Sequence, residues 1–447
     1  MSLIKPVLIF AAAAASSAAI SAAVPQWLET DSAAAIASRT RADFPYTVPE
    51  FLDIARRQYP NLTAAQLDDF IARKYVETLT FDDTLRVFRK ALRNMALLNP
   101  DMNGGRTSRN CDVTDARIAD VGSVLQALDG LSDTGAANRI VYSFAIDVPY
   151  DKAIAGDTLR VWMPLPFESP RQSNIKILSA SPANYILSDG RSIHNTIYFE
   201  APAPRKGETA HFEYTATFDT KGQYFSPDSI RARMLPYDRE SDFYRQYTSV
   251  EAPHIIRLDS LAHAIVGDET DPLRQSELVY DYIDSRYFWA GAREYSTIPC
   301  IPAYVLDEGH GDCGQVSLLY ISLMRSLGVP ARWESGWMLH PGSTGYHDWA
   351  EVYFEGIGWV PVDMSFGRYT RADDPRIVNF YSTGMDAYRF ATNHGVCGEL
   401  YPPKRFVRSE PVDFHAGEGE TSHGNLFYPA WDHKFNIISV TPIPLEK

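Results

Sequence analysis

The spacing of apolar residues changes from a helical to an alternating period near Arg139, and this change limits the possible folds more than any other feature. Over residues 27–131 apolar side chains recur every three or four positions, which is typical of amphipathic helices. From Ile140, and again from Phe212, apolar residues alternate with smaller or polar ones, which is typical of strands with one buried face. Separate stretches of the two kinds predict an α+β protein.

Two helices are expected in the helical stretch. One follows Thr63, a candidate N-cap, and its apolar face contains Leu67 and Phe70. The other is expected to place Asp82 and Asp83 in its first turn. Its apolar stripe would consist of four residues, Leu85, Phe88, Leu92 and Met95. Helical spacing returns at 255–265 and 273–287, after a Tyr- and Arg-rich stretch at 221–250 that we interpret as a linker.

The first residues have the three parts of a secretory signal peptide. A single positive charge at Lys5 precedes an apolar stretch that begins at Val7 and ends in small residues around Ala23. No later stretch offers about 18 consecutive apolar residues, so we expect no stable membrane span after cleavage. The sequence therefore predicts a periplasmic or secreted protein.

The charge balance excludes one class of partner. The chain has 42 Lys plus Arg against 56 Asp plus Glu, a formal net charge of −14. Without a basic excess there is no surface for tracking phosphates, so nucleic acid and anionic lipid are not expected partners.

The run GHGDCGQVSLLYISLMRSLGVPAR places Cys313 at the start of a predicted helix that ends before Gly328. A cysteine there lies at the positive end of the helix dipole, which favours the nucleophilic thiolate. The alternative is a small buried residue at a helix start. Further along, the segment YHDWAEVYF places His347 at the mouth of a strand, and GWVPVD places Asp363 at the end of the next. Adjacent antiparallel strands would bring these two side chains together, as a nucleophile, base and orienting acid require.

The order of these motifs resembles the catalytic core of the transglutaminase-like superfamily. The settings that carry the resemblance are GDC before a helix ending LGVPAR, then HDWAEV, then GWVPVD, over about residues 250–370. The resemblance implies a papain-like thiol fold with Cys313 as nucleophile, His347 as general base and then acid, and Asp363 as the residue that orients His347. Members include cross-linking acyltransferases, peptide hydrolases and amidases, and the fold does not choose among them.

Trp289, in the segment SRYFWAGAREY, is the candidate for the oxyanion hole. Its indole N–H could donate to a tetrahedral oxyanion beside the backbone N–H of Cys313. The alternative is that Trp289 and Tyr287 only form the wall of the cleft. His310 either rims the cleft or, as is more usual for a loop histidine, is solvated.

The remaining titratable residues suggest no cofactor and no metal. A tail segment contains four candidate ligands, His415, Glu418, Glu420 and His423, but their spacing fits no compact ligand pattern. Three cysteines remain beside the nucleophile, Cys111, Cys300 and Cys397, and a single bridge between the last two is one alternative.

We expect six segments. They are a signal peptide at 1–23, a helical N-terminal region at 24–136, a β-sandwich at 137–220, a linker at 221–250, a transglutaminase-like core at 251–390 and a C-terminal β extension at 391–447. The predicted function is that of a thiol hydrolase acting on a peptide or protein substrate through an acyl-enzyme. The alternatives are transfer of the acyl group to an amine, and a binding module whose triad is vestigial.

Overall fold

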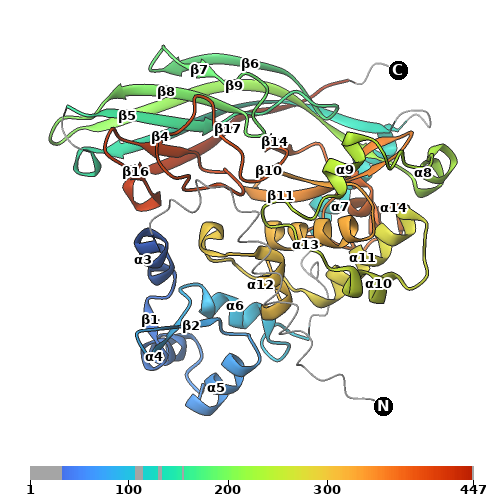
Figure 1. The fold of residues 1–447 in the computed structure, drawn as a ribbon, viewed down its shortest axis with the longest axis horizontal. Helices are drawn as coiled ribbons and strands as arrows, with labels where there is room; N and C mark the ends of the chain where they lie inside the picture. The colour runs from blue at the N-terminus through green and yellow to red at the C-terminus, as the bar shows by residue number, and fades with distance from the viewer. Residues whose placement is uncertain (1–32, 106–113, 129–132, 154–155, 445–447) are drawn as a thin grey trace. The chain divides into compact units, whose positions relative to one another are not determined.

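The structure is a computed structural model that describes residues 33–105, 114–128, 133–153 and 156–444 (Figure 1). The predicted signal peptide and Cys111 lie outside the described residues. The chain forms two compact units that interleave along the sequence. The first contains residues 33–105, 241–329 and 364–368, and the second contains the rest. The stretch predicted as one core at 251–390 contributes to both units.

The first unit is mainly helical. Its N-terminal part consists of α3 (Ala33–Asp43), β1 (Tyr46–Thr47), α4 (Val48–Gln58), α5 (Ala64–Ala72), β2 (Thr78–Phe81), β3 (Thr84–Val87) and α6 (Ala91–Leu98). Its second part consists of α9 (Asp242–Thr248), α10 (Asp259–Val266), α11 (Pro272–Arg286), η2 (Tyr295–Thr297), α12 (Ile301–Glu308) and α13 (Cys313–Ser326). Thr63 caps α5 as predicted, because its hydroxyl accepts from the Gln66 amide while the Gln66 side chain accepts from the Thr63 amide.

The prediction of a helix that begins at Asp82 and Asp83 is wrong in its first half. These two residues form the turn of a hairpin, with Phe81 paired to Thr84 on either side. Both have positive φ, 47° and 60°, as a two-residue turn that follows the twist of its strands requires. Aspartate tolerates this conformation better than most residues. The helical stripe therefore begins only at α6, and β1, β3 and β2 form a small sheet.

The second unit is built around antiparallel strands. It contains α7 (Asp115–Ala127), β4 (Thr134–Pro149), η1 (Tyr150–Lys152), β5 (Thr158–Pro164), β6 (Gln172–Ser181), β7 (Ile186–Leu187), β8 (Thr196–Pro202), β9 (Thr209–Tyr224) and α8 (Pro227–Arg233). Its later elements are β10 (Ala331–His340), β11 (Ser343–Phe354), β12 (Gly358–Val362), α14 (Pro375–Val378), η3 (Phe380–Ser382), β13 (Gly384–Met385), β14 (Arg389–Asn393), β15 (Glu418–Glu420), β16 (Asn425–Leu426), η4 (Tyr428–Ala430) and β17 (Asp432–Pro442).

Two of its sheets share one apolar core. One sheet has the order β13-β9-β4-β17 with β6 also on β9, and the other has the order β16-β15-β5-β8-β7. The alternation that begins at Ile140 is confirmed, because Ile140, Tyr142 and Phe144 are all fully buried. Strands from beyond residue 391 complete both sheets, since β17 pairs with β4 and β15 pairs with β5. The long strands β4, β9 and β17 lie side by side in Figure 1.

A third sheet of this unit, in the order β12-β11-β10-β14, carries the predicted histidine and aspartate. Trp337 and Leu339 of β10 and Phe390 of β14 belong to the same apolar core as β4, β5, β8 and β9. The third sheet is therefore anchored to the sandwich by buried aromatic side chains, which makes it a rigid support for polar groups at its other positions.

Candidate active site

Cys313 is the first residue of α13, as the sequence predicts. Asp312 caps this helix by accepting from the Gln315 amide at 3.2 Å, and the Gln315 side chain accepts from the Asp312 amide at 3.1 Å. The Tyr295 hydroxyl also donates to Asp312, which fixes the capping carboxylate. Within the described residues Cys313 forms no disulfide, and its side chain is half-buried. It therefore lies at the positive end of a well-formed helix and is open enough to react.

Trp289 lies on a segment that runs beside the loop before Cys313. Backbone hydrogen bonds join Gly311 N–H to the Phe288 carbonyl at 3.2 Å and Ala290 N–H to the Gly311 carbonyl at 3.4 Å. The half-buried Trp289 ring lies 4.9 Å from the guanidinium carbon of Arg93. The ring therefore packs against Arg93, and both the oxyanion role of its N–H and its place in a cleft wall stay predictions.

The N-terminal part of the first unit holds the segment that bears Trp289. Asn94, 1% exposed, donates to the Gly291 carbonyl at 3.0 Å and accepts from the Gly291 amide at 2.9 Å. Lys90 donates to the Ala292 carbonyl at 2.9 Å, and Asp43 accepts from the Glu294 amide at 2.7 Å. Sequence reasoning missed these residues, because no motif links them to a loop two hundred positions away.

His347 and Asp363 are brought together in the second unit, as predicted. The Nε2 atom of His347 lies 2.7 Å from Oδ2 of Asp363, and both side chains are buried. Pairing of Ala350 with Val362 sets this register, because it places the end of β12 beside the middle of β11. His347 lies within β11, opposite Gly336, and not at the mouth of a strand as the sequence indicated. The Asp363 contact occupies Nε2, so a proton transfer by this imidazole would use Nδ1.

The electrostatic surroundings of His347 favour its neutral form. Burial lowers the pKa of His347 below its ordinary value, Asp363 opposes this effect, and the Arg389 cation lowers the pKa again. Trp349 stacks beside the imidazole, with ring centroids 6.1 Å apart. A buried base that is neutral near physiological pH is suited to accept a proton.

Two other candidates lie elsewhere. His310 is buried and packs edge-on against Tyr304, with ring centroids 6.2 Å apart, so the prediction that it is solvated is wrong. The loop that carries it pairs with the segment at 288–290 through the bridge between His310 and Phe288, which a Gly-His-Gly sequence does not reveal. Within the described chain no disulfide joins Cys300 to Cys397. Burial raises the pKa of Cys300 and of Cys397 to about 12.

The candidate metal ligands of the tail, Glu418, Glu420 and His423, each contact a different partner. Glu418 pairs with Lys404 at 2.8 Å, and the backbone amide of Arg405 donates to Glu420 at 3.0 Å. His423 contacts Asp157 at 3.0 Å. Each of these groups is therefore engaged with the surrounding chain.

His415 instead joins Asp348 and Asp413 in a cluster that could offer three ligand atoms to a metal. Its Nε2 lies 2.8 Å from Oδ1 of Asp348, and its Nδ1 lies 3.6 Å from Oδ2 of Asp413. Two ligands of a tetrahedral zinc ion at about 2.0–2.1 Å would be separated by roughly 3.3 Å. The shorter separation fits a direct ion pair between His415 and Asp348 better than a shared ion.

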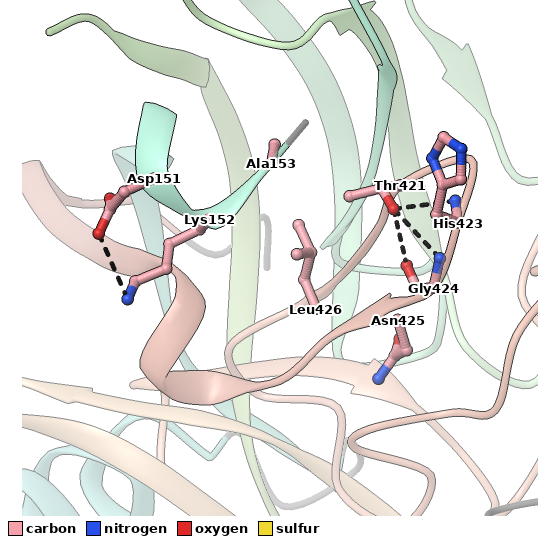
Figure 2. A pocket seen from close by; sticks show the side chains of 8 residues that line it. All are labelled: Asp151, Lys152, Ala153, Thr421, His423, Gly424, Asn425 and Leu426. Carbon is pink, nitrogen blue, oxygen red and sulfur yellow. Dashed lines mark hydrogen bonds and ion pairs between the residues drawn. The ribbon is translucent and has the colours of Figure 1, made fainter. Parts of the chain in front are cut away.

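A surface hollow of about 360 Å³ lies between η1 and the β15–β16 turn (Figure 2). Its polar groups are engaged with one another, since Lys152 contacts Asp151 at 3.5 Å. The Thr421 hydroxyl accepts from the amides of His423 and Gly424 at 3.0 and 3.1 Å. The lining residues show no arrangement of nucleophile and base.

Residues 259–364 match the family model of the transglutaminase-like superfamily core. The chain is 24% identical over 194 residues to the uncharacterized protein YebA of Bacillus subtilis, a match covering 39% of this chain and 26% of that protein. It therefore spans about a quarter of that relative. It is also 24% identical over 349 residues to an uncharacterized protein of Haemophilus influenzae, covering 68% of this chain and 91% of that protein.

The chain also matches solved structures, and one of them is described as a candidate cysteine protease from Cytophaga hutchinsonii. That match has 14% identity and a TM-score of 0.45, and it covers 70% of this chain and 92% of that one. The periplasmic domain of TgpA from Pseudomonas aeruginosa has 12% identity, a TM-score of 0.24, and coverage of 57% and 92%. Within the described residues, no helix has the length and apolar character to cross a membrane.

The fold class is α+β, and the chain carries a domain of the transglutaminase-like superfamily. Cys313, His347 and Asp363 all lie within its matched residues.

Proposed function

We propose that this protein is an exported thiol hydrolase that cleaves a peptide or amide bond through an acyl-enzyme on Cys313. The observation that carries the proposal is the buried contact of 2.7 Å between His347 and Asp363 inside the transglutaminase-like domain. The position of Cys313 at a capped helix start supports it independently. That Cys313, His347 and Asp363 act together is part of the proposal, and it is supported by their place in one matched family domain.

The proposed reaction begins when Nδ1 of His347 accepts the proton of the Cys313 thiol. The thiolate attacks the carbonyl carbon, and a tetrahedral oxyanion forms that the Cys313 backbone N–H and the Trp289 indole would stabilise. The carbon–nitrogen bond then breaks as His347 returns the proton to the leaving amine. In the second half His347 deprotonates water, water attacks the thioester, and the thiol of Cys313 leaves with its proton restored. Asp363 holds the imidazole and balances its transient positive charge.

Hydrolysis is preferred to transfer because water is the most abundant acceptor unless a site excludes it. No cofactor enters the proposed reaction. Export rests on the N-terminal sequence, and the peptide or protein nature of the substrate rests on the resemblance of the motifs. The acidic net charge of −14 argues against nucleic acid as a partner.

The test is a substrate screen with cell-wall peptides and unfolded proteins, comparing the native chain with Cys313→Ala. The matched control is Cys300→Ala, which removes a buried thiol that the reaction does not use. We expect cleavage products only with the native chain and the control. Products that depend on an added primary amine would identify a transferase. Equal product from Cys313→Ala, or none from the native chain on all substrates, would contradict the proposal and favour a binding module.

A further inference from the structure

The carboxylate of Asp363 is contacted by two cationic or donor groups. His347 Nε2 lies 2.7 Å from its Oδ2, and Nη1 of Arg389 lies 3.2 Å from the same oxygen. Arg389 is 1% exposed and Asp363 is fully buried. Neither the family motifs nor the spacing of Cys313, His347 and Asp363 predicts this arginine.

A second carboxylate holds Arg389 in place. Oδ2 of Asp386 accepts from Nη2 of Arg389 at 2.8 Å and from its Nε at 3.1 Å. Asp386 in turn accepts from the Tyr381 hydroxyl at 2.9 Å and from the Tyr388 amide at 2.9 Å, and its Oδ1 lies 3.4 Å from Nε2 of His340. Hydrogen bonds thus fix the guanidinium on Asp386, and the ion pair of 3.2 Å joins it to Asp363.

The fold explains why this arginine reaches Asp363. Arg389 begins β14, which pairs with β10 and shifts register between Ser335 and Gly336. A Cβ at Gly336 would lie 1.7 Å from the Phe390 carbonyl oxygen, so only glycine allows β14 to approach this closely. The guanidinium carbon of Arg389 also lies 5.6 Å from the centre of the Trp349 ring.

We propose that Arg389, clamped by Asp386, is a positioning residue for the reaction of Cys313: it holds the carboxylate of Asp363 directed at Nε2 of His347. This inference rests on the proposed function. Two buried carboxylates without a cation between them would be costly to bury. With Arg389 between them the group of three carries one net negative charge, which matches the positive charge that His347 gains during the reaction.

The pKa directions agree with this arrangement. Burial would raise the pKa of Asp386, but Arg389 and then His340 hold it well below its usual range. Burial would lower the pKa of Arg389, but Asp386 and Asp363 raise it. At His347 the two charges act in opposite directions, because Arg389 lowers its pKa and Asp386 raises it.

Charged and titratable groups face this imidazole from several elements. They are Asp363 after β12, Arg389 on β14, Asp386 before β14, and, behind Asp386, Tyr381 of η3 and His340 of β10. On its own strand His347 adjoins Asp348, which pairs with His415. Arg389 lowers the pKa of His347 and Asp386 raises it. A purely structural role would predict neither shift, so the two opposite shifts distinguish it from a positioning role.

The experiment measures the titration of His347 by NMR in chain labelled at histidine, with Cys313→Ala as the parent so that no thiol couples to the imidazole. Arg389→Gln should raise the pKa of His347, by on the order of one pH unit, and Asp386→Asn should lower it. Arg389→Lys should leave the pKa of His347 nearer to its value in the parent. The control is Arg408→Gln, which breaks another buried pair, that of Arg408 with Glu418, and should leave this titration unchanged.

In the chain with its thiol, Arg389→Gln should lower kcat on the order of tenfold to a hundredfold with little change in KM, and Arg389→Lys should recover part of the loss. Should Arg389→Gln fail to fold, Arg389→Lys and Asp386→Asn still report the two opposite shifts. A His347 titration that neither change moves, or that both move in one direction, would overturn the inference while leaving Cys313 as nucleophile. Conversely, full activity of Cys313→Ala would remove the proposed function without altering these titrations.

Discussion

Oδ2 of Asp363, the residue that follows β12, lies 2.7 Å from Nε2 of His347, in the middle of β11. The pairing of β11 with β12 fixes this relationship, and Arg389 supports it from β14. A polar pair at fully buried positions of a sheet anchored by aromatic side chains is expensive to maintain for stability alone. Its geometry is the one a general base requires.

Replacing Cys313 by alanine should abolish turnover while the fold survives. Loss of the nucleophile is expected to reduce the rate at least about 10³-fold, on the order of 4 kcal/mol in the barrier. The half-buried position leaves only a small cavity, so thermal unfolding should change little. Steady-state rates and melting curves check this, and near-normal activity would show that the nucleophile is assigned wrongly.

His347→Ala should abolish turnover as fully as Cys313→Ala, because the proposed reaction moves each proton through His347. The side chain is buried, so we also expect a loss of about 1–3 kcal/mol in unfolding free energy, in contrast to the cysteine variant. Denaturant unfolding measures that cost separately. Retained turnover in a folded His347→Ala chain would contradict the role of base.

Asp363→Asn should reduce activity less than removal of Cys313, because orientation of the imidazole assists the reaction without forming a bond. It should also destabilise the second unit, since Arg389 loses one of its two carboxylate partners. Measured kcat/KM and urea midpoints test the two effects. Activity equal to that of the native chain would make Asp363 a structural residue only.

Glu77 should make the first unit less stable as the pH rises. Burial raises its pKa to about 7 although Arg293 and the Tyr304 hydroxyl oppose this, so the folded state binds a proton that the unfolded state releases near pH 4.5. The contribution of this bound proton to the unfolding free energy is complete below pH 4.5 and is lost by about pH 7. As the pH rises from 5 to 8, the unfolding free energy of Glu77→Gln should therefore increase by about 2–3 kcal/mol relative to that of the native chain. A constant difference across this range would exclude the effect.

The alternating and helical periods predicted the elements that make local contacts. The buried face of β4, the start of α13 at Cys313 and the meeting of His347 with Asp363 all follow from short-range patterns, since β11 and β12 are consecutive strands. The turn at Asp82 was missed because acidic residues serve helix starts and tight turns equally well.

Pairing between strands that are far apart in the sequence determines the contacts that these patterns did not predict. Arg389 reaches Asp363 only because β14 joins β10 across about fifty residues, with a register shift that depends on Gly336. The addition of β17 to β4 joins segments almost three hundred residues apart. Hydrophobic periodicity identifies that a strand exists and which face is buried, but it carries no information about which partner the strand selects.

The central claim, that Cys313 and His347 act as a pair, is tested most directly by the pH dependence of alkylation at each cysteine, read by peptide mass spectrometry. Cys313 should react fastest at mildly acidic pH, whereas Cys300 and Cys397, whose pKa burial raises to about 12, serve as internal controls. His347→Ala should remove part of this advantage. A Cys313 profile centred near the ordinary value of about 8.5, and unchanged by the loss of His347, would contradict the account.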